Sequence, residues 1–223
     1  MNNKKIVLLT VVIFAIIVAL VMFFYLRGND ESQNKFSINN LENQPTLGDA
    51  NAPVSIVEFG DYKCPSCKAW GESIFPRLKE DYIDTGKAKL TYINVLFHGK
   101  ESLLAALASE SVYKQDPDNF WAFHQGIFDA QPSNQTHDEV WVTTDTLVEI
   151  AKAYAPDIDF DQFQKDIDEE GMLDEVKVDD QLVKDNEIQF TPSIIINGVL
   201  IEKPFDYEAI KAQIEKGLDN KNE

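Results

Sequence analysis

Hydrophobic and polar positions predict an α/β domain in the second part of the chain. The run Val54–Phe59 is apolar and rich in β-branched residues, as in a buried strand, and helical spacing follows over residues 68–78. A second apolar run, Lys89–Phe97, predicts another buried strand. Two strands joined through a helix favour a parallel pair, with helices packed on the sheet.

The region that follows is predominantly helical. From about residue 101 to residue 188, apolar residues recur at helical spacing, for example at Leu103, Leu104 and Leu107. The segment Ser193–Ile201 then places an Asn-Gly pair between two apolar runs, which predicts a β-hairpin. A last helix is expected from Asp206. The predicted order is strand, helix, strand, helical block, hairpin and helix.

The N-terminal pattern is different. Ile6 to Leu26 is continuously apolar apart from Thr10, which is long enough for a helix to span a bilayer. Lys4 and Lys5 precede it without a carboxylate, so the N-terminus is expected to stay in the cytoplasm. The bulky residues at its end do not match the small-residue cleavage site of a signal peptide, which favours a retained signal anchor.

These patterns predict three parts of the chain. Residues 1–27 form the signal anchor, and residues 28–46, which are polar and aperiodic, form a flexible linker. Residues 47–223 form one domain, long enough for a proper hydrophobic core.

The net charge of the chain limits the classes of partner that we expect for that domain. The chain has a formal net charge of −18, and all 38 acidic residues follow the apolar segment. This argues against nucleic acid or an anionic membrane surface as a partner. The clusters Asp157/Asp159/Asp161 and Asp174/Asp179/Asp180 make Ca²⁺ a candidate ligand, but no EF-hand spacing is present, and we assign no metal site.

The candidate chemistry centres on Cys64 and Cys67, the only two cysteines of the chain. They lie where the first strand leads into a helix, and Pro65 suits the first helical position. A helix N-terminus stabilises an anion, and the thiolate is the form of cysteine that attacks disulfides. We therefore expect an exposed, attacking Cys64 and a deeper, resolving Cys67, with Lys63 adding a nearby positive charge.

Two other uses of this pair remain open at this point. A C-x-x-C pair can be half of a zinc site, but His98, His124 and His137, the only histidines, are not paired at ligand spacing. The pair could also form an inert structural disulfide. Redox chemistry is the interpretation that we favour.

Two segments resemble the DsbA family, and in particular its membrane-anchored Gram-positive members. One is Glu58-Phe59-Gly60-Asp61-Tyr62-Lys63-Cys64-Pro65-Ser66-Cys67, and the other is Phe190-Thr191-Pro192-Ser193 at the start of the hairpin. The resemblance covers roughly residues 47–216. It implies a thioredoxin fold with an inserted helical domain at about 101–188, preceded by the transmembrane helix. Ser66 stands where DsbA has histidine, so a milder oxidant is expected.

The resemblance also assigns roles. Pro192 would be a cis-proline that faces the disulfide, with an ordinary edge-strand proline as the alternative. The Thr191 backbone would pair with an extended substrate beside Cys64, and Pro65 and Ser66 would contact that substrate.

Glu58 is the candidate proton carrier. It falls on the same strand face as Val54 and Ile56, which predicts a carboxyl group beneath the active site. Burial would raise its pKa and let it exchange a proton with Cys67; an exposed edge carboxylate is the alternative. Glu110 is either a second acid near the site or part of a solvated helix face.

The expected function is that of a membrane-anchored, extracytoplasmic thiol–disulfide oxidoreductase that introduces disulfides into reduced exported proteins. The resemblance implies reoxidation by a membrane quinone-linked thiol oxidase and no bound organic cofactor. One alternative is a reductase or isomerase, for example in cytochrome c maturation. The other is a carrier that holds a metal ion through the two thiolates.

Overall fold

The computed structural model describes residues 12–14, 16–22, 36, 38–39, 41–132 and 139–220. The chain divides into two compact units, Met1–Lys35 and Phe36–Glu223. In the first unit the described residues are helical. Within the described ranges no helix combines the length and the apolar character needed to cross a bilayer, and much of the predicted span at residues 6–26 lies outside them.

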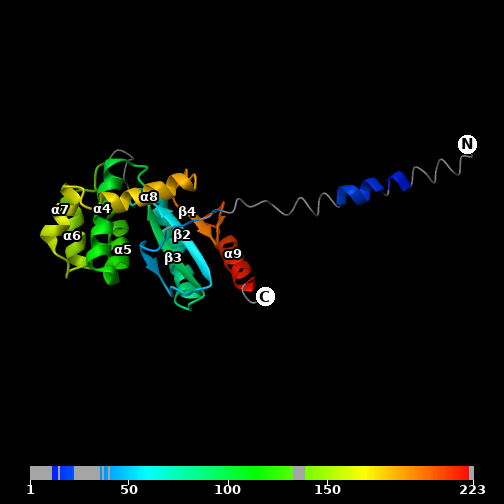
Figure 1. Ribbon diagram of the computed structural model, residues 1–223, viewed down its shortest axis with the longest axis horizontal. Helices are drawn as coiled ribbons and strands as arrows, with labels where there is room; N and C mark the ends of the chain where they lie inside the picture. Colours follow the sequence, from blue (N-terminus) through cyan, green and yellow to red (C-terminus); the bar gives the residue numbers. More distant parts are fainter. Residues whose placement is uncertain are drawn as a thin grey trace, which may run out of the picture. The chain divides into compact units, whose positions relative to one another are not determined.

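The second unit is built on a five-stranded sheet in the order β1-β3-β2-β4-β5 (Figure 1). Its strands are β1 (Thr46–Leu47), β2 (Val54–Gly60), β3 (Ala88–Asn94), β4 (Ser193–Ile196) and β5 (Val199–Leu200). The predicted parallel pair is confirmed, because β2 and β3 run parallel with Glu58 opposite Tyr92, while the other pairs are antiparallel. The predicted Asn-Gly hairpin is also present, with positive φ at Asn197 (47°) and Gly198 (81°).

The helix predicted at residues 68–78 is longer and interrupted. It begins at Pro65 as α2 (Pro65–Ser73), resumes as α3 (Phe75–Leu78) and ends in a π-helical turn, η1 (Lys79–Ile83). Pro76 lies in the first turn of α3 and has no N–H to donate to the preceding turn, which explains the break at Ile74.

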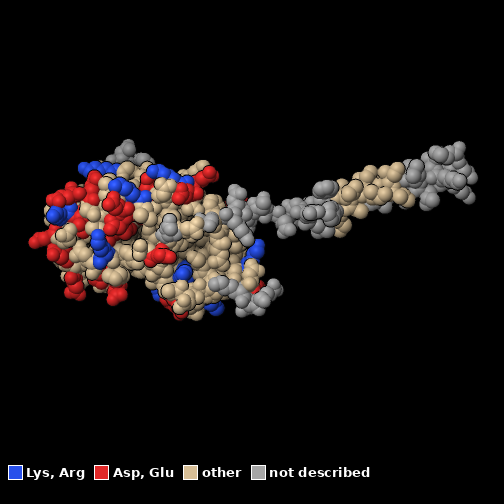
Figure 2. Space-filling view, viewed as in Figure 1, with Lys and Arg blue, Asp and Glu red and all other residues tan. Residues whose placement is uncertain are grey.

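The helical block predicted at about 101–188 is confirmed. It consists of α4 (Lys100–Gln115), the 3₁₀ turn η2 (Pro117–Asn119), α5 (Phe120–Ala130), α6 (Thr144–Tyr154), α7 (Phe160–Asp168) and α8 (Leu173–Asp185). In Figure 1, α4 to α7 gather to the left of the sheet, and α9 (Tyr207–Asp219) lies to its right. Acidic side chains crowd the surface of this block in Figure 2.

The alternation along β2 decides which helices cover each face of the sheet. Val54 and Ile56 point into a core shared with Trp70 of α2 and Ile210 of α9. The alternate residues of β2, which include Val57, pack on the opposite face against Leu182 and Val183 of α8. Glu58 belongs to the first face, which is the face that α2 covers.

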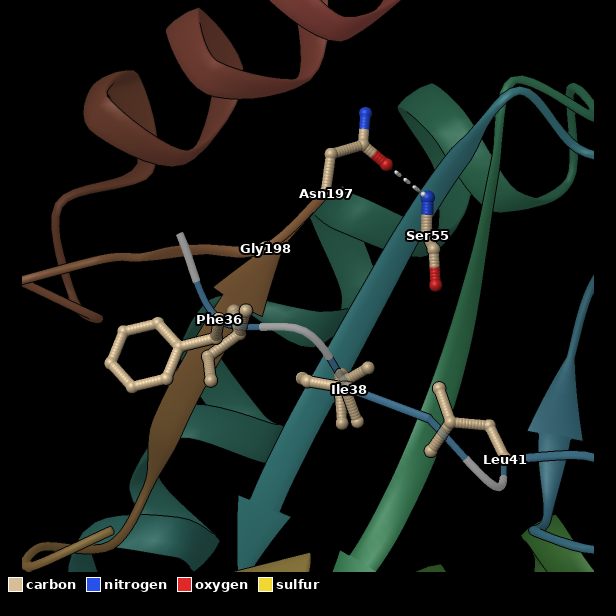
Figure 3. A pocket seen from close by; sticks show the side chains of 8 residues that line it. Phe36, Ile38, Leu41, Ser55, Asn197 and Gly198 are labelled. Atoms are coloured by element: carbon tan, nitrogen blue, oxygen red, sulfur yellow. Dashed lines mark hydrogen bonds between the residues drawn. The ribbon is translucent and has the colours of Figure 1, made fainter. Parts of the chain in front are cut away.

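Part of the segment predicted as a linker, residues 28–46, is folded onto the sheet. Phe36, Ile38 and Leu41 pack on the face of the sheet that carries Val57, the same face that α8 covers. Thr46, the last residue of the predicted linker, is already part of β1. Figure 3 shows Phe36 beside β4, Ile38 over β2 and Leu41 over β3, and the three side chains help to line a cavity of about 290 Å³. The Phe36 N–H donates to the Gly198 carbonyl at 2.7 Å. The predicted linker residues from Phe36 onward therefore belong to the folded unit.

Candidate active site

Cys64 and Cys67 lie where the sequence places them, between the end of β2 and the start of α2. Cys64 is the N-cap residue of α2 with extended backbone angles (φ −77°, ψ 119°), and Pro65 follows at the start of the helix. The Cys67 N–H donates to the Cys64 carbonyl at 3.1 Å. Both cysteines are free thiols, so the structure represents the reduced protein.

Cys64 is less exposed than the sequence suggested. It is 7% exposed and Cys67 is fully buried, so Cys64 is the accessible member of the pair, although only through a small opening. The Cys64 thiol donates a hydrogen bond to the Thr191 carbonyl at 3.5 Å. Pro65 and Ser66 are exposed beside it, where an incoming chain can reach them.

The surroundings of Cys64 favour its thiolate. A hydrogen bond from the Cys67 thiol is the largest cause that lowers the pKa of Cys64, from 9.0 to about 5, against an opposing effect of burial. A hydrogen bond with the Thr191 side chain, and then the backbone N–H groups of Cys67 and Ser66 at the helix N-terminus, lower this pKa further.

Lys63 does not contribute as predicted. Its ammonium group is turned away into the helical block, where it contacts Glu101 at 2.5 Å and the Glu139 carbonyl. The low pKa of Cys64 therefore comes from neutral hydrogen-bond donors and not from a lysine charge.

Cys67 has the opposite environment. Burial raises its pKa, and hydrogen bonding to Cys64 and the negative charges of Cys64 and Glu58 raise it further. The Asp61 N–H donates to the Cys67 sulfur at 3.4 Å. The surroundings of the two thiols therefore favour different protonation states, a thiolate at Cys64 and a protonated thiol at Cys67.

Glu58 is buried on the α2 side of β2, as predicted, and not at an exposed edge. Burial raises its pKa to about 8. The negative charge of Glu58 raises the pKa of Cys67, so the protonation of the two groups is linked. A group with this pKa can hold or release a proton near neutral pH.

The predicted cis-proline is also present, since the Thr191–Pro192 peptide bond is cis. Pro192 immediately precedes β4, in which Ser193 pairs with Phe59 of β2. This pairing brings Thr191 to Cys64. The structure therefore gathers Cys64, Cys67 and Thr191 at one end of the sheet, with Glu58 below them.

Residues that the sequence analysis left without a function surround this group. The carboxyl group of Asp61 contacts His98 and Ser102, and the Lys63–Glu101 ion pair lies beside them. Asp61 lies within the segment 58–67 that resembles the DsbA family, and this position is the sequence signal that could have identified it. Its partners lie in the turn before α4 and in the first turn of α4, and local periodicity carries no information about their contact with Asp61.

The remaining candidates have structural positions. His124 packs in the helical block and accepts or donates a hydrogen bond with the Tyr62 hydroxyl at 2.9 Å, and burial lowers its pKa to about 3. Glu110 is buried, so the solvated-face alternative is wrong. Burial and the charge of Asp179 raise the pKa of Glu110, and Asn94 donates to both carboxyl groups.

The aspartates considered for Ca²⁺ point to separate partners. Asp159 caps α7, Asp174 pairs with Lys177 and Asp180 pairs with Lys184. Within the described part of the chain, no three His, Cys, Asp or Glu side chains converge on a point that could hold a metal ion. His137 lies outside that part.

Comparison with known proteins agrees with this geometry. Residues 40–216 match the thioredoxin family profile. Disulfide bond formation protein D of Bacillus subtilis is 44% identical over 195 residues, which cover 87% of this chain and 85% of that protein. A putative protein-disulfide oxidoreductase of Rickettsia bellii is 26% identical over 80% of this chain and 66% of its own length.

Solved structures give the same result. Oxidised BdbD of Bacillus subtilis superposes with a TM-score of 0.79 at 42% identity, covering 84% of this chain and all of the other. DsbA of Chlamydia trachomatis superposes with a TM-score of 0.64 at 26% identity, covering 78% and 90% of the two chains. The chain belongs to the thioredoxin family, in the DsbA-like group that includes disulfide bond formation protein D, and it is a protein thiol–disulfide oxidoreductase.

Proposed function

We propose that this protein is an oxidase of exported proteins, held at the outer face of the cell membrane by residues 6–26. Its Cys64–Cys67 disulfide would be passed to substrates that still carry reduced cysteines. The observation that carries this direction is the low pKa of Cys64, about 5. A disulfide has no charge to stabilise, so surroundings that favour the thiolate favour the reduced protein and make the disulfide a stronger oxidant.

The reaction has two exchanges. A substrate thiolate attacks the Cys64 sulfur, the Cys64–Cys67 bond breaks, and Cys67 leaves with the electron pair and takes up a proton. Glu58 is the proposed source of that proton, because its pKa of about 8 keeps it largely protonated at neutral pH. A second substrate thiolate then attacks the substrate sulfur of the mixed disulfide, and Cys64 leaves as a thiolate stabilised at the start of α2.

The exposed surface around Cys64 would hold the substrate. The Thr191 backbone lies against Cys64 and is half-buried, while Pro65 and Ser66 are exposed. An extended substrate that pairs with Thr191 would place its cysteine beside the Cys64 sulfur. Repeated turnover then needs a partner that restores the disulfide, and we propose a membrane quinone-linked thiol oxidase for that role.

The test is oxidation of a reduced exported protein by the purified, oxidised chain. Activity should be lost in Cys64→Ser. Cys67→Ser, with Cys64 first converted to its mixed disulfide with glutathione, should exchange glutathione for a substrate thiol and accumulate a mixed disulfide with the substrate through Cys64. Retained activity in Cys64→Ser would contradict the assignment. A potential below about −250 mV against glutathione would instead favour a disulfide reductase. Resistance of the full chain to carbonate extraction from membranes tests the anchor.

A further inference from the structure

Asp61 forms backbone hydrogen bonds with both cysteine residues of the motif. Its backbone N–H donates to the Cys67 sulfur at 3.4 Å, and its carbonyl accepts from the Cys64 N–H at 2.9 Å. One oxygen of its side chain, Oδ1, accepts from the Lys63 N–H at 2.9 Å. Asp61 therefore accepts the hydrogen bonds that stabilise the turn from residue 61 to residue 64.

The other carboxyl oxygen ties that turn to the helical insertion. Asp61 Oδ2 lies 2.8 Å from His98 Nδ1 and accepts from the Ser102 hydroxyl at 3.0 Å. The His98 N–H also donates to it at 3.3 Å. Ser102 stands in the first turn of α4 and is buried, and the Asp61 side chain is fully buried as well. Four donors or donor-capable groups thus fix the orientation of one carboxyl group.

This arrangement matters for Cys67 because its sulfur has no contact with solvent. When the disulfide opens, the Cys67 sulfur carries negative charge until a proton arrives, and water cannot solvate it. A fixed N–H aimed at the site of developing charge stabilises such an atom without reorganisation. The Asp61 N–H is in that position, and its hydrogen bond is the contribution that lowers the pKa of Cys67 against the larger effect of burial.

We infer that Asp61 is a positioning residue for the Cys67 step: its carboxyl group, held by His98 and Ser102, aims its own N–H at the Cys67 sulfur. The inference deepens the proposed function and rests on it only for the direction of the reaction. The negative charge on Cys67 is transient. Opening and closing of the disulfide should therefore both slow when the Asp61 N–H no longer points at the Cys67 sulfur. Their ratio, which sets the reduction potential, should change little.

Two variants and a matched control test this. Asp61→Asn keeps the size of the side chain but replaces one acceptor oxygen by an NH₂ group among the donors of His98 and Ser102. Ser102→Ala removes one of the anchoring contacts and leaves residue 61 unchanged. Ser111→Ala is the control, because Ser111 is also buried on α4 and donates to an aspartate, Asp166, at 2.7 Å, away from the cysteines.

The readouts are the rate of opening of the disulfide by dithiothreitol, the rate of its re-formation by oxidised glutathione, and the equilibrium potential. We expect Asp61→Asn to slow both rates about tenfold, as for the loss of one hydrogen bond to a charged group. Ser102→Ala should slow both about threefold. Ser111→Ala should match wild type, and the equilibrium constant with glutathione, which gives the potential, should change less than about twofold in all variants.

Three outcomes would overturn the inference. The first is unchanged rates in Asp61→Asn, the second is Ser102→Ala behaving like Ser111→Ala, and the third is a shift in potential that accounts for the whole change in rate. If Asp61→Asn does not fold, the comparison of Ser102→Ala with Ser111→Ala decides. Oxidation of a reduced exported protein is measured separately. If the wild-type protein does not oxidise that substrate, the proposed function is wrong. The rates with dithiothreitol would still test the role of Asp61 in that case.

Discussion

Reduction of the Cys64–Cys67 disulfide should make the folded protein more stable at neutral pH, because only the reduced form contains the Cys64 thiolate. The pKa of Cys64 is lowered from 9.0 to about 5. At pH 7 a thiol with a pKa of about 5 gains about 2.7 kcal/mol from ionisation, relative to one with a pKa of about 9. Screening by solvent at the opening above the sulfur reduces this, and we expect about 1.5–2.7 kcal/mol.

The sign of the pH dependence follows from the lowered pKa. The extra stability of the reduced form is fully present above pH 9, falls by about 1.4 kcal/mol per pH unit as the pH drops toward 5, and is absent below 5. Buried carboxyl groups titrate in both redox forms, so their effect largely cancels in the difference between them. Below about pH 8 the Cys67 thiol is protonated in the folded and the unfolded protein alike, so in this range the difference isolates Cys64.

The assay is denaturant unfolding of the reduced and oxidised protein at pH 4.5, 6 and 7.5, without oxygen. The stability gap should be near zero at pH 4.5 and grow at each step. In parallel, the potential at pH 7 should lie up to about 60 mV above that of an unfolded peptide with the Cys-Pro-Ser-Cys sequence. A gap that is equal at pH 4.5 and 7.5, or an oxidised form that is the more stable at pH 7.5, would refute the reasoning.

Two further expectations concern the buried groups under the site. Burial raises the pKa of Glu58 from 4.5 to about 8, so the folded state holds its proton more tightly and stability falls as the pH rises between these values. Glu58→Gln should remove about 1.4 kcal/mol per pH unit of that fall, and urea midpoints with an unchanged slope from pH 5 to 8 would contradict it. The Tyr92 hydroxyl is buried without a hydrogen-bond partner among the described residues, so Tyr92→Phe should raise the free energy of unfolding by about 1 kcal/mol. A loss of stability in that variant would show that the hydroxyl has a partner.

The positions of the cysteines and of Glu58 could be predicted because the signals are local. A β-branched run, a proline at the first helical position and strand alternation fix the neighbours of these residues within a few positions of the chain. The hairpin was equally readable, since Asn197 and Gly198 are residue types that accept positive φ. The short strand β1 was not, because two residues show no periodicity.

The partners of the motif residues could not be predicted for a different reason. Glu101 and Ser102 reach Lys63 and Asp61 only through the packing of the helical insertion against the end of the sheet. Hydrophobic periodicity indicates that α4 is a helix, and it does not specify which of its polar residues enters the active site. The chemistry of the cysteines was readable from the sequence, while the groups that hold them in place required the fold.

Lys63 shows what this difference means for the electrostatics. A lysine next to Cys64 in sequence suggests a thiolate stabilised by a full charge, which salt would weaken. In the structure the lysine is paired with Glu101, and the groups that lower the pKa of Cys64 are the Cys67 thiol, the Thr191 side chain and backbone N–H groups. Short-range hydrogen bonds of this kind are little screened, so raising the ionic strength from 0.05 to 1 M should move the pKa of Cys64 by less than about 0.3.

Ultraviolet absorbance of the thiolate measures that pKa directly in the wild-type protein. The variant Lys63→Met gives an independent test. Removing one partner of this partly buried ion pair should cost about 1–3 kcal/mol of stability while leaving the pKa of Cys64 within about 0.3 of wild type. A rise of one unit or more, in salt or in the variant, would mean that the charge of Lys63 acts on Cys64 despite its pairing. The low pKa would then have to be assigned to that charge and not to the hydrogen bonds that Cys64 receives from Cys67, Thr191 and the helix N-terminus.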